Sequence, residues 1–128
     1  WIDTLNMSAQ TLEDATDLMT ILTKKSIKQR NVGGHLEVSF AHEDVTDRAL
    51  MMRVAVRVLR DLRLSDHLAV VVCHGDKEHD HFHVNVCLVH PETGNLWSVG
   101  HPKRTIEASL RALERDEGLR ETPGHLHH

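Results

Sequence analysis

The pattern of apolar and polar positions changes period along the chain, and each period predicts a type of element. Residues 9–27 carry apolar side chains at every third or fourth position, which predicts an amphipathic helix. Residues 35–41 alternate strictly between apolar and polar, which is typical of a half-buried strand. A broad apolar stripe predicts a second helix, which is expected to begin at Thr46 and to have Asp47 in its first turn. A third helix is expected over residues 105–117, with Gly118 as its C-cap.

The most informative stretch is residues 70–90, where two apolar runs flank a short polar connection. Both runs are rich in strand-forming residues, so they predict a β-hairpin with its connection at residues 75–80. The second arm alternates, so that His81, His83 and Asn85 share one face while apolar residues occupy the other. Two imidazoles therefore stand about 6.5–7 Å apart on one side of a strand.

These elements together predict an α+β fold, in which an antiparallel sheet of about five strands is flanked by helices. Residues 96–99 are expected to form a short strand or an extended piece, and residues 1–8 have no clear period. The chain has 128 residues, so we expect one domain over residues 1–128. Residues 125–128 are interpreted as a tail or tag remnant.

Composition narrows the class of protein. The net charge of −4 argues against a strongly electrostatic nucleic-acid binder. The two cysteines, Cys73 and Cys87, lie inside apolar runs and are interpreted as reduced, buried thiols of a cytoplasmic protein. The longest apolar run is too short to cross a bilayer, so no membrane insertion is expected. The arginines of the second helix most simply form its solvated face, although part of that face could contact phosphate.

The histidines of the hairpin are candidates for a metal site. His74 ends the first arm, and together with His81 and His83 it can supply three neutral imidazoles to one divalent ion. Such a site keeps a coordination position open for substrate. The competing interpretation is that a histidine-rich chain has surface histidines by chance. The expected cofactor is a divalent metal ion, with Mn, Mg, Zn, Co and Ni all left open.

The histidine pattern also resembles a known family. The segment reads His74-x-Asp76-x-x-His79-x-His81-Phe82-His83, and it is followed by Val89-His90-Pro91-Glu92-Thr93-Gly94. It is similar to the relaxases, the mobilisation nucleases of plasmids, and more broadly to endonucleases with a His-hydrophobic-His motif. The resemblance implies a five-stranded antiparallel sheet with a metal held by His74, His81 and His83. It also implies that Asp76 holds a histidine in the correct tautomer or steers a proton.

The resemblance further implies an activity and its partners. Relaxases nick one DNA strand at a plasmid transfer origin during conjugation or mobilisation, and a tyrosine stays joined to the 5′ end. Single-stranded DNA is then the expected partner, with accessory DNA-processing and coupling proteins, in the bacterial cytoplasm. Glu37 lies on the polar face of the strand at residues 35–41. It would reach the metal pocket if that strand adjoins the hairpin, and it is otherwise a surface carboxylate.

The sequence contains no tyrosine, so alternatives stay open. The nucleophile is expected on a segment ahead of Trp1 that this chain lacks, unless another residue type serves. A replication-initiator or transposase nuclease usually carries its tyrosine on a helix after the motif, and residues 105–117 have none. A non-catalytic DNA-binding or assembly module with the same fold is a further alternative. Metal-dependent hydrolysis of a small molecule is supported only by the generic histidine site.

Overall fold

The structure, a computed structural model, describes residues 1–6, 13, 33–40, 46–73, 81–119 and 126–127. In chain order these residues form β1 (Ile2–Leu5), β2 (Gly33–Ser39), α2 (Arg48–Asp61), β3 (Ala69–Val72), β4 (His81–Cys87), α3 (Pro102–Glu117) and β5 (Leu126–His127). The helix expected over residues 9–27 lies, apart from residue 13, outside the described residues. The hairpin connection expected at residues 75–80 also lies outside them.

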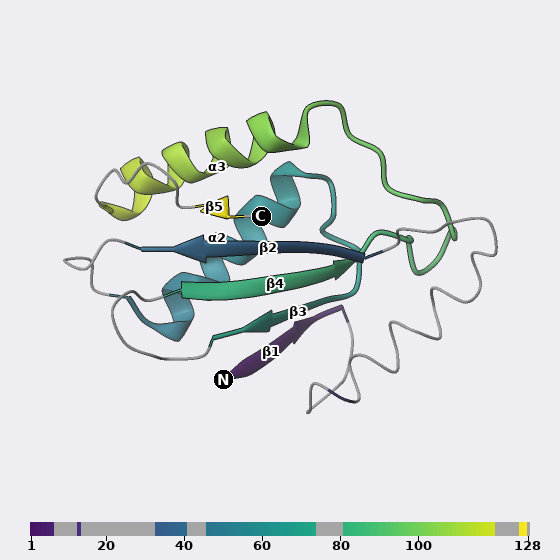
Figure 1. The fold of residues 1–128 in the computed structure, drawn as a ribbon, viewed down its shortest axis with the longest axis horizontal. Helices are drawn as coiled ribbons and strands as arrows, with labels where there is room; N and C mark the ends of the chain where they lie inside the picture. The colour runs from purple at the N-terminus through teal and green to yellow at the C-terminus, as the bar shows by residue number, and fades with distance from the viewer. Residues whose placement is uncertain (7–12, 14–32, 41–45, 74–80, 120–125, 128) are drawn as a thin grey trace.

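The five strands form one antiparallel sheet in the order β1-β3-β4-β2-β5 (Figure 1). This confirms the predicted α+β fold and the predicted antiparallel pairing of the two hairpin arms, β3 and β4. Strand β2 lies beside β4 on the side away from β3. The order of elements therefore brings the alternating strand near residue 35 directly against the histidine-bearing strand.

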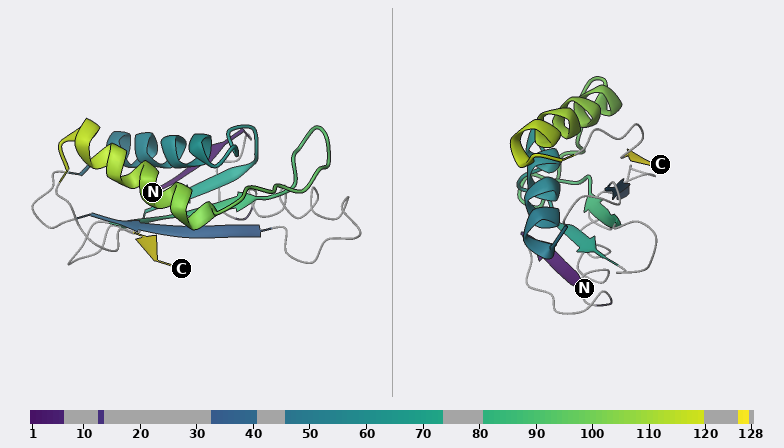
Figure 2. Two further views of the ribbon diagram at one scale, coloured as in Figure 1. Left: turned by 90° about the horizontal axis from the view of Figure 1, so that it is seen from above. Right: turned by 90° about the vertical axis from the view of Figure 1, so that its left-hand side faces the viewer.

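Both described helices cover the same face of the sheet (Figure 2). The hydrophobic core lies between them and the strands, and it is built from alternate residues of each strand. From β2 and β4 it receives Leu36, Val38, Phe82, Val84 and Val86. Among the described residues, no helix is long and apolar enough to cross a membrane.

Local signals explain where the helices begin and end. The Asp47 side chain accepts a hydrogen bond of 2.8 Å from the backbone N–H of Leu50, and the Asp47 backbone is extended. Asp47 is therefore the N-cap of α2, and the expectation that it lies in the first turn was wrong. Helix α3 begins at Pro102, earlier than expected, because proline suits a first helical turn. Gly118 is its C-cap at φ 68°, as predicted.

One sequence expectation about the strands needs correction. Residues 1–8 have no clear period, yet Ile2–Leu5 form β1, which pairs with β3. Residues 96–99, expected as a short strand or an extended piece, form none of the named strands, and Leu96 makes an isolated bridge to Val89. Strand β1 is short, and it depends on a partner strand far away in sequence, which local periodicity does not report.

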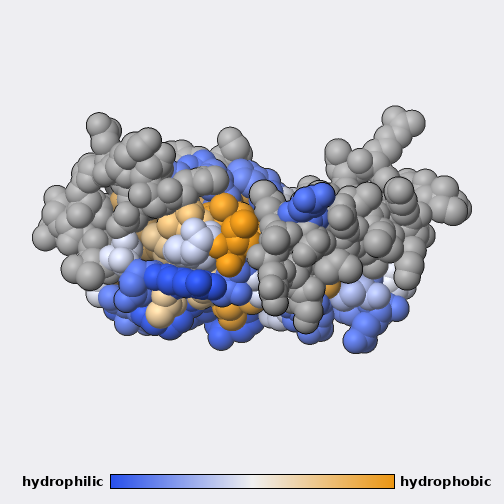
Figure 3. All heavy atoms as spheres, turned by 90° about the horizontal axis from the view of Figure 1, so that it is seen from below, coloured by the Kyte–Doolittle hydropathy of each residue, from blue (hydrophilic) through white to orange (hydrophobic). Residues whose placement is uncertain are grey.

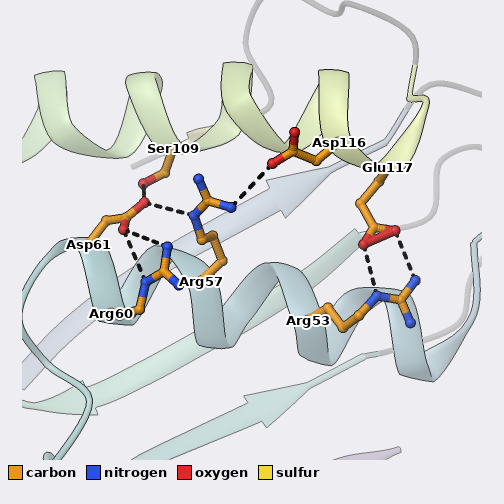
Figure 4. A network of polar contacts seen from close by, with 7 residues as sticks. All are labelled: Arg53, Arg57, Arg60, Asp61, Ser109, Asp116 and Glu117. Atoms are coloured by element: carbon orange, nitrogen blue, oxygen red, sulfur yellow. Dashed lines mark hydrogen bonds and ion pairs between the residues drawn. The ribbon is translucent and has the colours of Figure 1, made fainter.

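The outer faces of α2 and α3 are joined by charged pairs (Figure 4). Arg53 donates two hydrogen bonds of 2.9 Å to Glu117, a bidentate pair. Arg57 contacts Asp61 at 3.2 Å and Asp116 at 3.4 Å. The arginine face of α2 is thus partly solvated, as expected, but it also binds the neighbouring helix through carboxylates.

Asp61 is a carboxylate of this network with partners on both helices. The buried Ser109 hydroxyl donates a hydrogen bond to it, and Arg57 and Arg60 lie beside it. Burial acts to raise the pKa of Asp61, but the hydrogen bonds from Ser109 and Arg57 outweigh it, so the pKa lies below its ordinary value.

Strand β1 forms one edge of the sheet, and a single arginine covers its start. Arg48 of α2 pairs with Asp3 at 3.0 Å and lies 5.0 Å from the centre of the Trp1 ring.

On the side of the molecule shown in Figure 3, a hydrophobic area is bordered by hydrophilic side chains. Charged side chains beside an edge strand discourage pairing with another chain.

Phe82 provides a test of the core, because its side chain is fully buried between the sheet and the helices. Phe82→Ala should lower the free energy of unfolding by about 3–5 kcal/mol, since it leaves a cavity. The measurement is urea unfolding followed by circular dichroism. Val56→Ala serves as the control, because Val56 is 47% exposed on α2 and its loss should change stability little. Equal effects of the two substitutions would contradict this core assignment.

Asp61 provides a test of the helix–helix network. Because its pKa is lowered by folding, Asp61 contributes stability above its unfolded pKa and loses it as the pH falls through the folded pKa. Asp61→Asn should therefore lower stability at pH 7 and make the loss of stability between about pH 5 and pH 2 shallower. Unfolding measured across this range checks the slope, with Glu107→Gln, an exposed residue of α3, as the control. An unchanged slope in Asp61→Asn would be evidence against the network.

Candidate metal centre

Three potential ligands meet on the face of the sheet opposite the core-facing side chains. They are Glu37 on β2 and His81 and His83 on β4, and one ligand atom from each lies within 4.8 Å of the others. Glu37 is directly opposite His83, and Ser39 is opposite His81. Opposed residues of an antiparallel pair share a face, so the register itself brings the carboxylate to the imidazoles.

The local sequence explains why these side chains point away from the core. On β4, His81 and His83 alternate with Phe82 and Val84, which are buried under the helices. On β2, Glu37 lies between Leu36 and Val38, which are buried in the same core. Burial of the apolar set therefore directs the polar set to the opposite face.

The distances suit a divalent ion. The Nε2 atom of His81 lies 3.9 Å from Oε1 of Glu37. Ligands about 2.1 Å from a shared ion stand about 3–4 Å apart, so small side-chain rotations would close the site. The side chains of His81 and Glu37 are 22% and 31% exposed, which leaves them shielded but open to a ligand from solvent. Two imidazoles and a carboxylate are a suitable donor set for such an ion.

His35 extends this group along β2. Its Nε2 atom lies 3.2 Å from Nδ1 of His83, and the two rings are stacked with centres 5.3 Å apart. The rings of His81 and His83 are nearly perpendicular, with centres 5.4 Å apart. On the side of His83 that faces β3, the directly opposite residue is Val72, an apolar neighbour that is 9% exposed.

The candidate residues from the sequence have different outcomes. His81 and His83 share one face of β4, and Glu37 joins them because β2 adjoins that strand. His74 and Asp76 lie outside the described residues, so their places in the site stay predictions. The ligand roles of His81 and His83, and any role of Glu37, likewise remain predictions.

Sequence reasoning did not assign a role to His35. The alternation placed it on the same face as Glu37, but the partner strand was not known. Because His35 is opposite Asn85, it is the diagonal neighbour of His83, two residues along. That relation follows from the β2–β4 register and has no local signal in the sequence.

Other described histidines have structural contacts elsewhere. His67 is buried, and its Nδ1 atom lies 2.7 Å from the carbonyl oxygen of Cys87. His90 accepts hydrogen bonds at Nδ1 from the backbone N–H groups of Glu92 and Thr93. These contacts stabilise the chain after β4, at the opposite end of that strand from His81.

The cysteines are free thiols and are buried, as the sequence predicted. Burial raises the pKa of the Cys87 thiol, although a backbone hydrogen bond at Val89 opposes the shift. A protonated thiol is a poor metal ligand. The Cys73 thiol contacts the carbonyl oxygen of His81 at 3.4 Å, and the backbone N–H of Cys73 donates to the carbonyl of Trp1. The start of the chain therefore lies at the His81 end of the sheet.

Comparison with known proteins agrees with this architecture. The family model described as "Relaxase: MobA/VirD2-like, nuclease domain" matches residues 1–119. No curated protein and no solved structure matches the chain. The match spans all the described strands except β5 and includes both β2 and β4. The chain therefore belongs to the relaxase family, as a MobA/VirD2-like nuclease domain.

Proposed function

We propose that this domain is the metal-dependent DNA-nicking core of a relaxase that acts on one strand at a plasmid transfer origin. The observation that carries the proposal is the convergence of Glu37, His81 and His83 on one face of the sheet. Membership of the relaxase family supports a nuclease activity. The plasmid origin, the metal dependence and the accessory and coupling proteins belong to the proposal.

In the proposed site, His74, His81 and His83 hold a divalent ion. When bound, such an ion supplies Lewis-acid polarisation of a phosphate oxygen and fixes the phosphate for in-line attack. Glu37 stands beside His81, where its carboxylate either joins the ligand set or orients that ring. Asp76 holds a histidine tautomer or steers a proton, as the family resemblance implies.

The nucleophile in this proposal is a tyrosine on a segment joined ahead of Trp1. Its hydroxyl oxygen loses its proton and bonds to phosphorus as the bond to the 3′ oxygen breaks, and the departing 3′ oxygen takes up a proton, so the step balances. The geometry of Trp1 supports this entry point. Its backbone nitrogen donates a hydrogen bond of 2.8 Å to the carbonyl of Cys73, whose thiol contacts His81. A segment joined there would enter the sheet at the end where His81 lies.

A second candidate function is a non-catalytic DNA-binding or assembly module on the same fold. The observation that favours it is the absence of tyrosine from the sequence. In this case the metal site would stabilise the sheet face, and DNA would be bound without being cut. Formation of a covalent DNA adduct by a tyrosine-bearing version separates the two functions.

His81→Ala should abolish tight binding of Co²⁺, because the remaining groups offer too few ligands. His90→Ala is the matched control, since that imidazole is engaged by backbone N–H groups at the other end of β4. Calorimetric titration of the metal-free protein measures both. Binding should also weaken as the pH falls through the imidazole range, because protons compete for the ligand nitrogens. Equal affinity in wild type and His81→Ala would remove His81 from the site.

The 128-residue chain should bind single-stranded DNA weakly, with an affinity that falls as salt rises. Without a tyrosine, it should form no covalent adduct with oligonucleotides that tile a transfer origin. A version extended ahead of Trp1 by a tyrosine-bearing segment should form a 5′-linked adduct, and the same version with Tyr replaced by Phe should not. Denaturing gels detect the adduct. An adduct formed by the 128-residue chain alone would show that another residue is the nucleophile.

A further inference from the structure

His35 makes a contact that the proposed reaction does not use. It is exposed on β2, and its Nε2 atom lies 3.2 Å from Nδ1 of His83. The rings are stacked with an angle of 24° between their planes. One member of the pair is therefore a candidate ligand, and the other lies at the margin of the site.

The sheet register holds this contact in place. His83 is opposite Glu37, and His35 is opposite Asn85. Diagonal neighbours of an antiparallel pair are about 7–8 Å apart, which is within reach of two imidazoles. Both residues lie inside regular strands, so their backbones are held by the ladder hydrogen bonds on each side.

The direction of this hydrogen bond decides which tautomer His83 adopts. A neutral imidazole has one N–H and one nitrogen lone pair. If Nδ1 of His83 donates to His35, its lone pair is on Nε2, where an ion can be bound. If Nδ1 accepts, Nε2 carries the proton and cannot bind a metal. A ligating histidine generally donates its other N–H to a neighbouring acceptor, which fixes the ring and its tautomer.

We infer that His35 is a positioning residue for His83: it accepts the Nδ1–H of His83 at Nε2 and leaves the Nε2 lone pair of His83 for the ion. The inference rests on the proposed metal site. It assigns His83 Nε2 as the ligand nitrogen, because Nδ1 is engaged by His35. His35 must then carry its own proton on Nδ1. Because His35 is exposed, that N–H can donate a hydrogen bond to water.

Two substitutions separate the hydrogen bond from the stacking of the rings. His35→Phe keeps an aromatic ring beside His83 but has no acceptor, whereas His35→Gln keeps an acceptor and loses the imidazole ring. His35→Phe should weaken Co²⁺ binding by about 10–100-fold, the usual effect of losing such a partner. His35→Gln should bind within about threefold of wild type, because its amide oxygen can accept the same N–H.

Calorimetric titration with Co²⁺ measures these affinities, and His81→Ala defines the background from the other histidines of the chain. His101→Asn is the control for loss of an exposed imidazole. His101 precedes α3 in a left-handed conformation, which asparagine tolerates. Thermal unfolding of the His35 and His101 variants should match wild type, because both positions are exposed.

A second readout needs no metal. Long-range ¹H–¹⁵N spectra of the imidazoles report which ring nitrogen carries the proton. In wild type and His35→Gln, His83 should be the Nδ1–H tautomer, and in His35→Phe the Nε2–H form should appear. An Nε2–H tautomer of His83 in metal-free wild type would overturn the inference.

The outcomes also distinguish this inference from the proposed function. If wild type binds no Co²⁺ above the His81→Ala background, the metal site and the role of His35 are both overturned. If wild type binds but His35→Phe binds equally well, only the role of His35 is overturned. If His35→Phe and His35→Gln are equally weak, an acceptor at this position does not restore binding, so the hydrogen bond does not orient His83, which also overturns the inference.

Discussion

The pairing of β2 with β4 is the constraint on which the rest of the structure depends. Its register runs from Gly33 opposite Cys87 to Ser39 opposite His81. The same pairing directs apolar side chains toward the helices and brings Glu37 opposite His83 on the other face. A slip of one residue would turn the imidazoles into the core and the apolar side chains outward. Core packing and site assembly therefore specify the same register.

The two helices hold this register from the opposite side. Side chains such as Phe82 and Val38 are buried beneath them, and the outer surfaces of α2 and α3 are joined by arginine–carboxylate pairs. The indole N–H of Trp97 also donates a hydrogen bond of 2.6 Å to the carbonyl of Leu62, at the end of α2. These contacts lie on the helix side of the sheet. The acid sensitivity expected from Asp61 is thus structurally separate from the competition between protons and metal at the histidines.

On the site side, the donor groups are carried by two adjacent strands. Regular strands position side chains more exactly than loops, which suits the proposed role of holding a phosphate for in-line attack. His35, His83 and His81 follow one another across this surface, each ring in contact with the next. In the proposed site, metal affinity would be set by the ligands and also by the neighbour that fixes the tautomer of one of them. The proposed nucleophile is a separate part that approaches at the Trp1 end.

The sequence by itself determined which side chains would be buried and which would share a face. The alternation at Leu36 and Val38, and at Phe82 and Val84, was sufficient because burial of apolar area acts residue by residue along a strand. The histidine spacing was sufficient to suggest the site and the family. The sequence did not reveal β1, because that strand exists only through its pairing with β3.

Tertiary structure decided how separate segments meet. Some forty residues separate Glu37 from His81, and the two side chains approach each other only because β2 lies beside β4. The periodicity of the sequence was compatible with several other orders of the strands in an antiparallel sheet. The contact between His35 and His83 and the pairing of Arg53 with Glu117 have the same origin. Periodicity describes one strand or helix at a time, whereas the register between strands is chosen by the packing of the whole core.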